Sequence, residues 1–173
     1  FNGEFEMWES RTNDKLTGWV NGGSFTQSTD VYSGTYALEL QTVGPSLNNP
    51  QVSSGAAYTC QDAPSGKGGI PYSTQIDTLV FHYKYLPADP NDKGRMYVWF
   101  KKNGSNLPFQ IYKPLAISAS YSQVAIPFDV GQVPDSINIS IESSTWPILS
   151  SYIGSDLKID NLYLKSQSIP ISS

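Results

Sequence analysis

The sequence predicts an all-β protein, a two-sheet antiparallel β-sandwich of the jelly-roll type. Valine, isoleucine, tyrosine, phenylalanine and tryptophan gather in short alternating runs that Gly, Pro, Asn and Ser separate, which is typical of strands and turns. The 173 residues include 14 Gly and 12 Pro, which leaves few places for a helix. About ten strands in one chain need two packed sheets to bury their apolar faces.

The expected strands of the first half are residues 5–9, 19–20, 24–27, 36–42 and 52–59. The first is the apolar run that starts at Phe5. The next two flank an Asn-Gly-Gly turn, so we expect a short hairpin. In 36–42, Leu38 and Leu40 alternate with Glu39 and Gln41, which predicts one side facing a core and the other facing water. The strand at 52–59 lies within long Pro- and Gly-containing loops.

The expected strands of the second half are residues 78–86, 95–101, 109–113, 122–128, 137–142 and 157–165. Each is rich in β-branched and aromatic residues. Turn sequences such as Lys102-Asn103-Gly104 separate them, which predicts an antiparallel meander or Greek key.

Length and composition predict one domain over residues 1–165, followed by a polar tail at 166–173. Two domains would leave fewer than about 90 residues each, where a core without disulfides is marginal. Apolar residues make up 39% of the chain and charged residues only 15%, so we expect most of the chain to fold.

Charge and hydropathy argue against two classes of partner. The net charge of -4 comes without a basic cluster, so we do not expect nucleic-acid binding. No apolar run approaches the ~18 residues of a membrane span, so we expect no membrane insertion. The chain opens at Phe1 without a charged start or hydrophobic signal core, which we interpret as a soluble, already processed chain. The single cysteine, Cys60, permits no internal disulfide and leaves the compartment open.

Little in the sequence predicts catalysis. His82 is the one histidine, so a multi-histidine zinc site is impossible and a Ser-His-Asp triad would depend on this ring. A hydrogen-bonded strand histidine is the alternative. Most acids sit in turn sequences, although a carboxylate pair for glycoside hydrolysis among the strand acids stays open. We therefore assign no catalytic residue.

The most informative strand is residues 95–101. Alternation puts Met96, Val98 and Phe100 on one face and Arg95, Tyr97, Trp99 and Lys101 on the other. Flat rings stack on the C–H faces of pyranoses, and neighbouring polar groups bond the hydroxyls. This pattern predicts a carbohydrate-binding face. The alternative is that Tyr97 and Trp99 cover the core with only their rims exposed.

Four more residues are candidates for this face or its border. We expect His82, with Lys84, and Tyr112 to join it from neighbouring strands. Trp146 lies in a loop between strands, where an indole has less core to enter, and is a candidate second contact. The alternative for Trp146 is a lid that folds back on the edge of the sandwich.

Three segments carry a family resemblance: Asn2-Gly3-Glu4-Phe5-Glu6, residues 30–38 with their Ser-Gly, and Ile159-Asp160-Asn161-Leu162-Tyr163-Leu164. They resemble the jelly-roll carbohydrate-binding modules. Residues 78–86, 95–101, 137–144 and 154–160 resemble a carbohydrate-metabolism domain found in surface and secreted proteins of polysaccharide-degrading Gram-negative bacteria.

The resemblance implies a structural calcium ion. Its ligands would be the side chains of Glu6, Asp30 and Asp160 and the carbonyls of Glu4 and Ser33. Such hard oxygen donors suit calcium, which takes six to eight of them. The alternative is that Glu6 and Asp160 only accept hydrogen bonds from backbone amides at the edge of the sandwich.

These patterns and the resemblance together suggest three functions. The first is a noncatalytic carbohydrate-binding or accessory module of an exported polysaccharide-utilisation system, at the periplasm, the outer-membrane surface or outside the cell, with a polysaccharide as partner. The second is a glycoside hydrolase or lyase on the same fold. The third is a structural or adhesion domain that uses the aromatic face to bind a neighbouring domain or surface protein.

Overall fold

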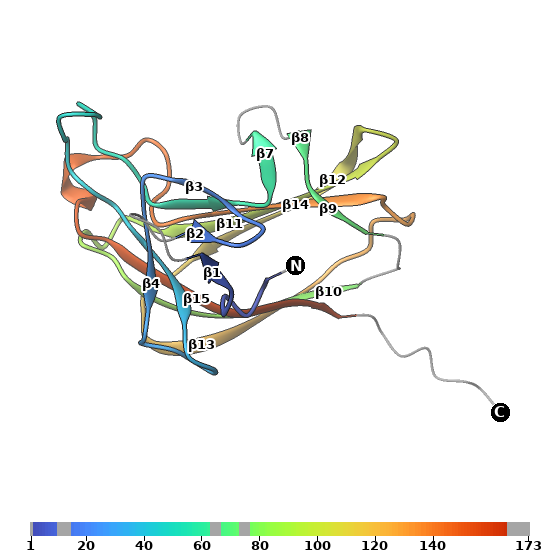
Figure 1. The fold of residues 1–173 in the computed structure, drawn as a ribbon, viewed down its shortest axis with the longest axis horizontal. Helices are drawn as coiled ribbons and strands as arrows, with labels where there is room; N and C mark the ends of the chain where they lie inside the picture. The colour runs from blue at the N-terminus through green and yellow to red at the C-terminus, as the bar shows by residue number, and fades with distance from the viewer. Residues whose placement is uncertain (1, 10–14, 63–66, 73–76, 166–173) are drawn as a thin grey trace.

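The computed structural model describes residues 2–9, 15–62, 67–72 and 77–165, and the expected tail at 166–173 lies outside this part. Its main elements form two antiparallel sheets stacked as a sandwich (Figure 1), which confirms the predicted fold class. In the described part the one helical element is a short 3₁₀ turn, Ser150–Tyr152, and no helix is long and apolar enough to span a membrane.

One sheet, here called the β10 sheet, has the strand order β13-β10-β15-β5-β4. Its strands are β4 (Ser24–Ser28), β5 (Ala37–Gln41), β10 (Thr78–Leu86), β13 (Ser118–Pro127) and β15 (Asp156–Lys165).

The second sheet, here called the β11 sheet, has the order β12-β11-β14-β6-β3, with β9 also paired to β14. Its strands are β3 (Val20–Gly22), β6 (Ala56–Tyr58), β9 (Ile70–Pro71), β11 (Gly94–Lys102), β12 (Ser105–Leu115) and β14 (Ser136–Glu142). Two small ribbons complete the fold: β1 (Trp8–Glu9) with β2 (Lys15–Leu16), and β7 (Cys60–Asp62) with β8 (Lys67–Gly68).

The core lies between the two sheets and follows the alternation of the strands. Met96, Val98 and Phe100 of β11 are fully buried, as the period-2 pattern predicts. Leu79 and Phe81 of β10 are fully buried from the other sheet. The two inner faces therefore form one apolar layer. The residues that alternate with the core residues along each strand point outward.

The expected hairpin around Asn21-Gly22-Gly23 is wrong. β3 pairs with β6 in the β11 sheet, whereas β4 pairs with β5 in the β10 sheet. The chain crosses from one sheet to the other at Gly23, whose φ is +65° and where a Cβ atom would lie 2.1 Å from the Ser54 carbonyl oxygen. A glycine turn therefore fits this crossing as well as it fits a hairpin.

The N-terminal segment lies beside the last strand. The amide of Leu162 in β15 donates to the carbonyl oxygen of Gly3 over 2.8 Å. The expected first strand at 5–9 is shorter than predicted, since only β1 pairs within it, and Phe5 is a buried residue with a φ of 59°. This arrangement brings Glu6 close to the end of the chain that carries Asp160.

Candidate functional site

The outer side of the β11 sheet gathers the aromatic residues that the sequence singled out. In the register, Tyr97 of β11 lies opposite Tyr112 of β12 and Ser140 of β14, and Ser140 lies opposite Tyr58 of β6. Two residues along β11, on the same side of the strand, Arg95 lies opposite Glu142 of β14. We call this surface the aromatic face; it consists of Tyr58, Arg95, Tyr97, Trp99, Tyr112, Ser140 and Glu142.

Three rings of the aromatic face contact one another. The Tyr97 and Tyr112 centroids are 5.6 Å apart with planes at 57°, and those of Tyr97 and Trp99 are 6.1 Å apart in an edge-to-face arrangement. Tyr112 is 50% exposed, whereas Tyr97 and Trp99 are half-buried. The rings thus support one another and still present surface to solvent.

Trp99 is also held through its indole nitrogen. With the Asn138 amide oriented to satisfy both neighbours, its oxygen accepts from Trp99 Nε1 over 3.1 Å and its nitrogen donates to the Gly68 carbonyl oxygen over 3.2 Å. Asn138 is fully buried. Trp99 therefore has a packing role as well as an exposed rim, and Tyr112 is the cleaner probe of ligand binding.

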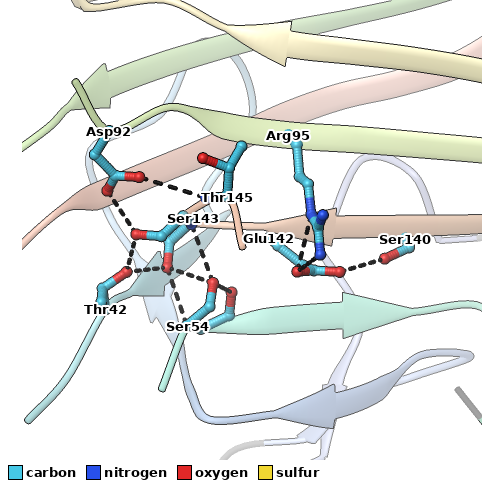
Figure 2. A network of polar contacts seen from close by, with 10 residues as sticks. Thr42, Ser54, Asp92, Arg95, Ser140, Glu142, Ser143 and Thr145 are labelled. Carbon is cyan, nitrogen blue, oxygen red and sulfur yellow. Dashed lines mark hydrogen bonds and ion pairs between the residues drawn. The ribbon is translucent and has the colours of Figure 1, made fainter. Parts of the chain in front are cut away.

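The charges on the aromatic face are paired. Arg95 Nε and Nη2 donate to Glu142 Oε2 over 3.0 and 2.5 Å, and Ser140 Oγ donates to Glu142 Oε1 over 3.2 Å (Figure 2). Because the guanidinium and the carboxylate neutralise each other, this pair adds polar groups to the face but no net charge.

A groove of about 270 Å³ opens at the Tyr58 end of this face. It is lined by Ala56, Tyr58 and Glu142, by residues of the 49–54 loop and by Ile148. Tyr58 is not among the site residues that the sequence predicts. Alternation within a three-residue strand carries too little signal, and only the pairing of β6 with β14 brings this ring to the face.

A buried polar network fixes the loops beside the groove (Figure 2). Ser143 Oγ lies 2.8 Å from Thr42 Oγ1 and 3.1 Å from Ser54 Oγ, and Ser144 Oγ donates to Asp92 Oδ2 over 2.6 Å. Thr42, Asp92, Ser143 and Ser144 are all nearly or fully buried. The loop that follows β14 therefore leaves the sheet in one defined direction.

Trp146 lies two residues beyond this network and is 76% exposed. A lid folded back on the sandwich would cover the indole, so this exposure argues against the lid interpretation. Its loop neighbour Ile148 lines the groove, although Trp146 itself does not.

The expected place of His82 and Lys84 is wrong. Both lie on β10, in the other sheet from Arg95 and Tyr112. His82 is only 4% exposed and is paired in register with Gln123 and Asp160. Consecutive strands can alternate between the two sheets of a sandwich, so neighbours in sequence need not share a face. Lys101 is 8% exposed and adds little surface to the aromatic face.

Two of the residues implied as calcium ligands, Glu6 and Asp160, contact the 29–36 loop, which contains Asp30 and Ser33. Glu6 Oε1 accepts from the amides of Thr35 and Tyr36 over 2.8 and 3.1 Å. Asp160 Oδ2 accepts from the amides of Tyr32 and Ser33 over 2.8 and 2.9 Å. Glu6 and Asp160 thus accept hydrogen bonds from backbone amides, which is the alternative to calcium binding given above.

The oxygen atoms of these groups are of the kind that calcium prefers, but their arrangement does not leave them free to bind an ion. Asp30 Oδ2 is paired with Lys84 Nζ at 2.7 Å, and amide hydrogens point at Glu6 and Asp160. Among the residues that the structure describes, no group of three or more His, Cys, Asp or Glu is placed to hold a metal ion. Glu4 is exposed, as is Ser33. Calcium therefore stays a prediction.

Comparison with known proteins supports the fold. No protein-family model and no curated protein matches the sequence. Among solved structures, the Family 16 Carbohydrate Binding Module-2 matches with a TM-score of 0.55 at 15% identity, over 95% of this chain and 96% of that one. The Family 11 module from Clostridium thermocellum, in complex with a β-1,3-1,4-mixed-linked tetrasaccharide, matches with a TM-score of 0.50 at 12% identity, over 88% and 91%.

A third similar structure is the enzymatically active domain of bacteriophage CBA120 tailspike protein 4, with a TM-score of 0.57 at 14% identity. That match covers 86% of this chain but only 19% of the tailspike chain. This chain thus spans about a fifth of that tailspike chain and nearly the whole of the two binding modules. It has the jelly-roll-like sandwich fold of carbohydrate-binding modules.

Proposed function

We propose that this chain is a noncatalytic carbohydrate-binding module and that the aromatic face with its groove binds a polysaccharide. The observation that carries the proposal is the contact of Tyr97 with Trp99 and Tyr112 on the outer side of one sheet, beside the Arg95–Glu142 pair. Rings of this kind stack on sugar faces, and the pair offers donors and acceptors to hydroxyls.

The register suggests how a sugar chain would lie. Tyr112, Tyr97, Ser140 and Tyr58 form one row across four adjacent strands. Because adjacent strands are about 4.8 Å apart, this row spans ~14 Å, which is enough for a short oligosaccharide. The sugar chain would cross the strands and end in the groove at Tyr58. Trp146 is a candidate contact for a longer ligand, since it is exposed near the loop that borders the groove.

A binding role fits this face better than hydrolysis. Glycosidases need two carboxyl groups, about 5 or about 6.5–9.5 Å apart, flanking the bond. Glu142 is the one carboxylate among the described residues that line the groove, and it is held in an ion pair with Arg95. His82, which a triad would require, lies in the other sheet.

Affinity electrophoresis through gels that contain one polysaccharide each, such as mixed-linked β-glucan, galactan or galactomannan, tests the proposal. The parent protein should be retarded in at least one gel, and Tyr112→Ala should lose the retardation without a change in melting temperature. Tyr163→Ala removes a similarly exposed ring from the β10 sheet and should behave as the parent does.

The other outcomes favour the alternative functions. Reducing ends that accumulate with the parent protein would favour a hydrolase or lyase. A parent that no gel retards would contradict the proposal and favour a structural or adhesion role.

The cellular context is proposed from the family resemblance alone. An exported polysaccharide-utilisation system would put the module in the periplasm, at the outer-membrane surface or outside the cell, beside other domains or surface proteins. Fractionation of cells that express the full-length protein tests this, and a purely cytoplasmic signal would contradict it.

A further inference from the structure

The outer side of the β10 sheet carries a second aromatic feature, remote from the aromatic face. The ring of Tyr32, from the 29–36 loop, stacks on the ring of His82 with centroids 3.5 Å apart and planes at 10°. His82 is 4% exposed beneath it, whereas Tyr32 is 50% exposed. Because the imidazole covers one face of the tyrosine ring, the opposite face is the one on which a ligand could stack.

The Tyr32 ring is held in place before any ligand arrives. The backbone amides of Tyr32 and Ser33 donate to Asp160 Oδ2, and Asp160 is fully buried in β15. A flat ring fixed by its own backbone and by stacking loses little freedom when a ligand covers it. That lowers the entropic cost of binding, which commonly limits weak sites.

Polar groups lie close in sequence to the two stacked rings: Asp30 is in the same loop as Tyr32, and Lys84 follows His82 by two residues on β10. Lys84 Nζ pairs with Asp30 Oδ2 at 2.7 Å, and the Tyr121 hydroxyl donates to the Asp30 carbonyl oxygen over 2.6 Å. The Tyr121 ring lies 6.2 Å from that of Tyr32. An ammonium group has three donors and Asp30 takes one, so Lys84 keeps donors for a ligand hydroxyl. The Asp30 carboxylate is partly exposed and can accept.

We propose that Tyr32 is the platform of a second carbohydrate site, sized for a single neutral sugar residue. The sugar stacks on the free face of the ring, and its hydroxyls bond Lys84 and Asp30. The Lys84–Asp30 pair balances its own charge, which favours a neutral sugar over a uronate. The site lies on the opposite sheet from the aromatic face, so the two can bind separate stretches of polysaccharide and raise overall avidity.

A purely structural role is the alternative, in which Tyr32 only covers His82. The two roles differ in whether an added sugar changes the chemical shifts of residues around Tyr32. Backbone amide shifts of ¹⁵N-labelled full chain should be followed during titration with methyl β-glucopyranoside, methyl β-galactopyranoside and methyl α-mannopyranoside. A binding platform predicts saturable shifts at Tyr32, Ser33 and Lys84 with at least one glycoside, with affinity of about millimolar strength.

Matched variants separate stacking from the fold. Tyr32→Phe keeps the ring and should keep the shifts, whereas Tyr32→Ala should abolish them. Lys84→Met keeps the aliphatic stem and removes the donors, so it should weaken binding about tenfold. This variant tests the site even if Tyr32→Ala does not fold. Tyr163→Ala, which removes an exposed tyrosine from β15, should leave the shifts unchanged.

Two results would overturn this second site: no saturable shift at Tyr32, Ser33 or Lys84 with any of the three glycosides, or shifts that persist unchanged in both Tyr32→Ala and Lys84→Met. Shifts at Tyr97 and Tyr112 report on the aromatic face separately. Loss of one set of shifts with retention of the other therefore shows which of the two sites fails.

Discussion

Ser143 and Gly55 bond each other twice. The amide of Ser143 donates to the carbonyl oxygen of Gly55 over 2.9 Å, and the amide of Gly55 donates to Ser143 Oγ over 2.9 Å. The second bond makes the serine side chain part of the backbone connection between the end of β14 and the start of β6. A Cβ atom at Gly55 would lie 2.2 Å from the Ser24 carbonyl oxygen, so the close approach also requires glycine.

Ser143→Ala should therefore destabilise the protein. It removes the acceptor of the Gly55 amide and a partner of Thr42 and Ser54 in a fully buried place. Leaving buried polar groups without partners costs about 1–3 kcal/mol. Urea unfolding followed by tryptophan fluorescence measures this free energy. Ser120→Ala, at an exposed position of β13, is the control and should change it by less than about 0.5 kcal/mol. Equal stability of the two variants would mean that the network adds nothing.

Lys158→Met should cost about 1–3 kcal/mol of unfolding free energy, less than breaking a fully buried pair, because its two carboxylate partners are partly exposed. Lys158 Nζ bridges Asp156 Oδ2 at 2.5 Å and Glu39 Oε1 at 2.8 Å on the outer side of the β10 sheet. Burial disfavours its ammonium, but hydrogen bonds to both carboxylates outweigh burial and hold the Lys158 pKa above its usual value. Without the lysine, two half-buried carboxylates face each other.

The Lys158 prediction has an internal control. Adding Asp156→Asn to Lys158→Met removes one of the two repelling charges and should recover part of the lost stability in the same urea experiment. A double variant no more stable than the single one would show that the loss comes from packing of the lysine stem.

Acidification should destabilise the fold through His82. Burial lowers the His82 pKa below its ordinary 6.5, and the nearby Asp160 charge only partly opposes this. The unfolded chain therefore binds a proton at a higher pH than the folded chain does. Stability is complete above the unfolded value and falls as the pH drops through 6.5 toward the folded pKa.

Thermal melts at pH 7.5 and 5.5 test the His82 prediction. The parent protein should melt at a lower temperature at pH 5.5. His82→Phe keeps a ring beneath Tyr32 and cannot take up a proton, so its melting temperature should fall less. The same decrease in both proteins would assign the pH effect to other groups.

Calcium should raise the melting temperature if the ion binds the folded state at Glu6, Asp30 and Asp160, because a ligand of the folded state alone stabilises it. Melts in calcium and in chelator measure this shift, and Asp160→Asn should reduce it. Identical curves for the parent protein, with no metal by elemental analysis, would leave Glu6 and Asp160 with their amide bonds as their whole role.

Local patterns in the sequence predicted the strands and their sides. Met96, Val98 and Phe100 point into the core, and Arg95, Tyr97 and Trp99 point outward, because the side-chain period of a strand is two wherever the strand lies. The motifs at both ends also predicted that Glu6 and Asp160 lie close to the same loop. The first prediction needed only a few consecutive residues, whereas the second came from the resemblance of segments at both ends of the chain to a known family.

Only the tertiary structure decided which strands are neighbours. Tyr58 joins Tyr97 and Tyr112 because β6 pairs with β14, whereas His82 lies in the opposite sheet, beneath Tyr32. Backbone hydrogen bonds between strands are nearly the same for every residue type, so a sequence carries little local information about pairing partners. The fit of many distant apolar side chains in one core selects the partners, and that fit exists only once the whole sandwich has formed.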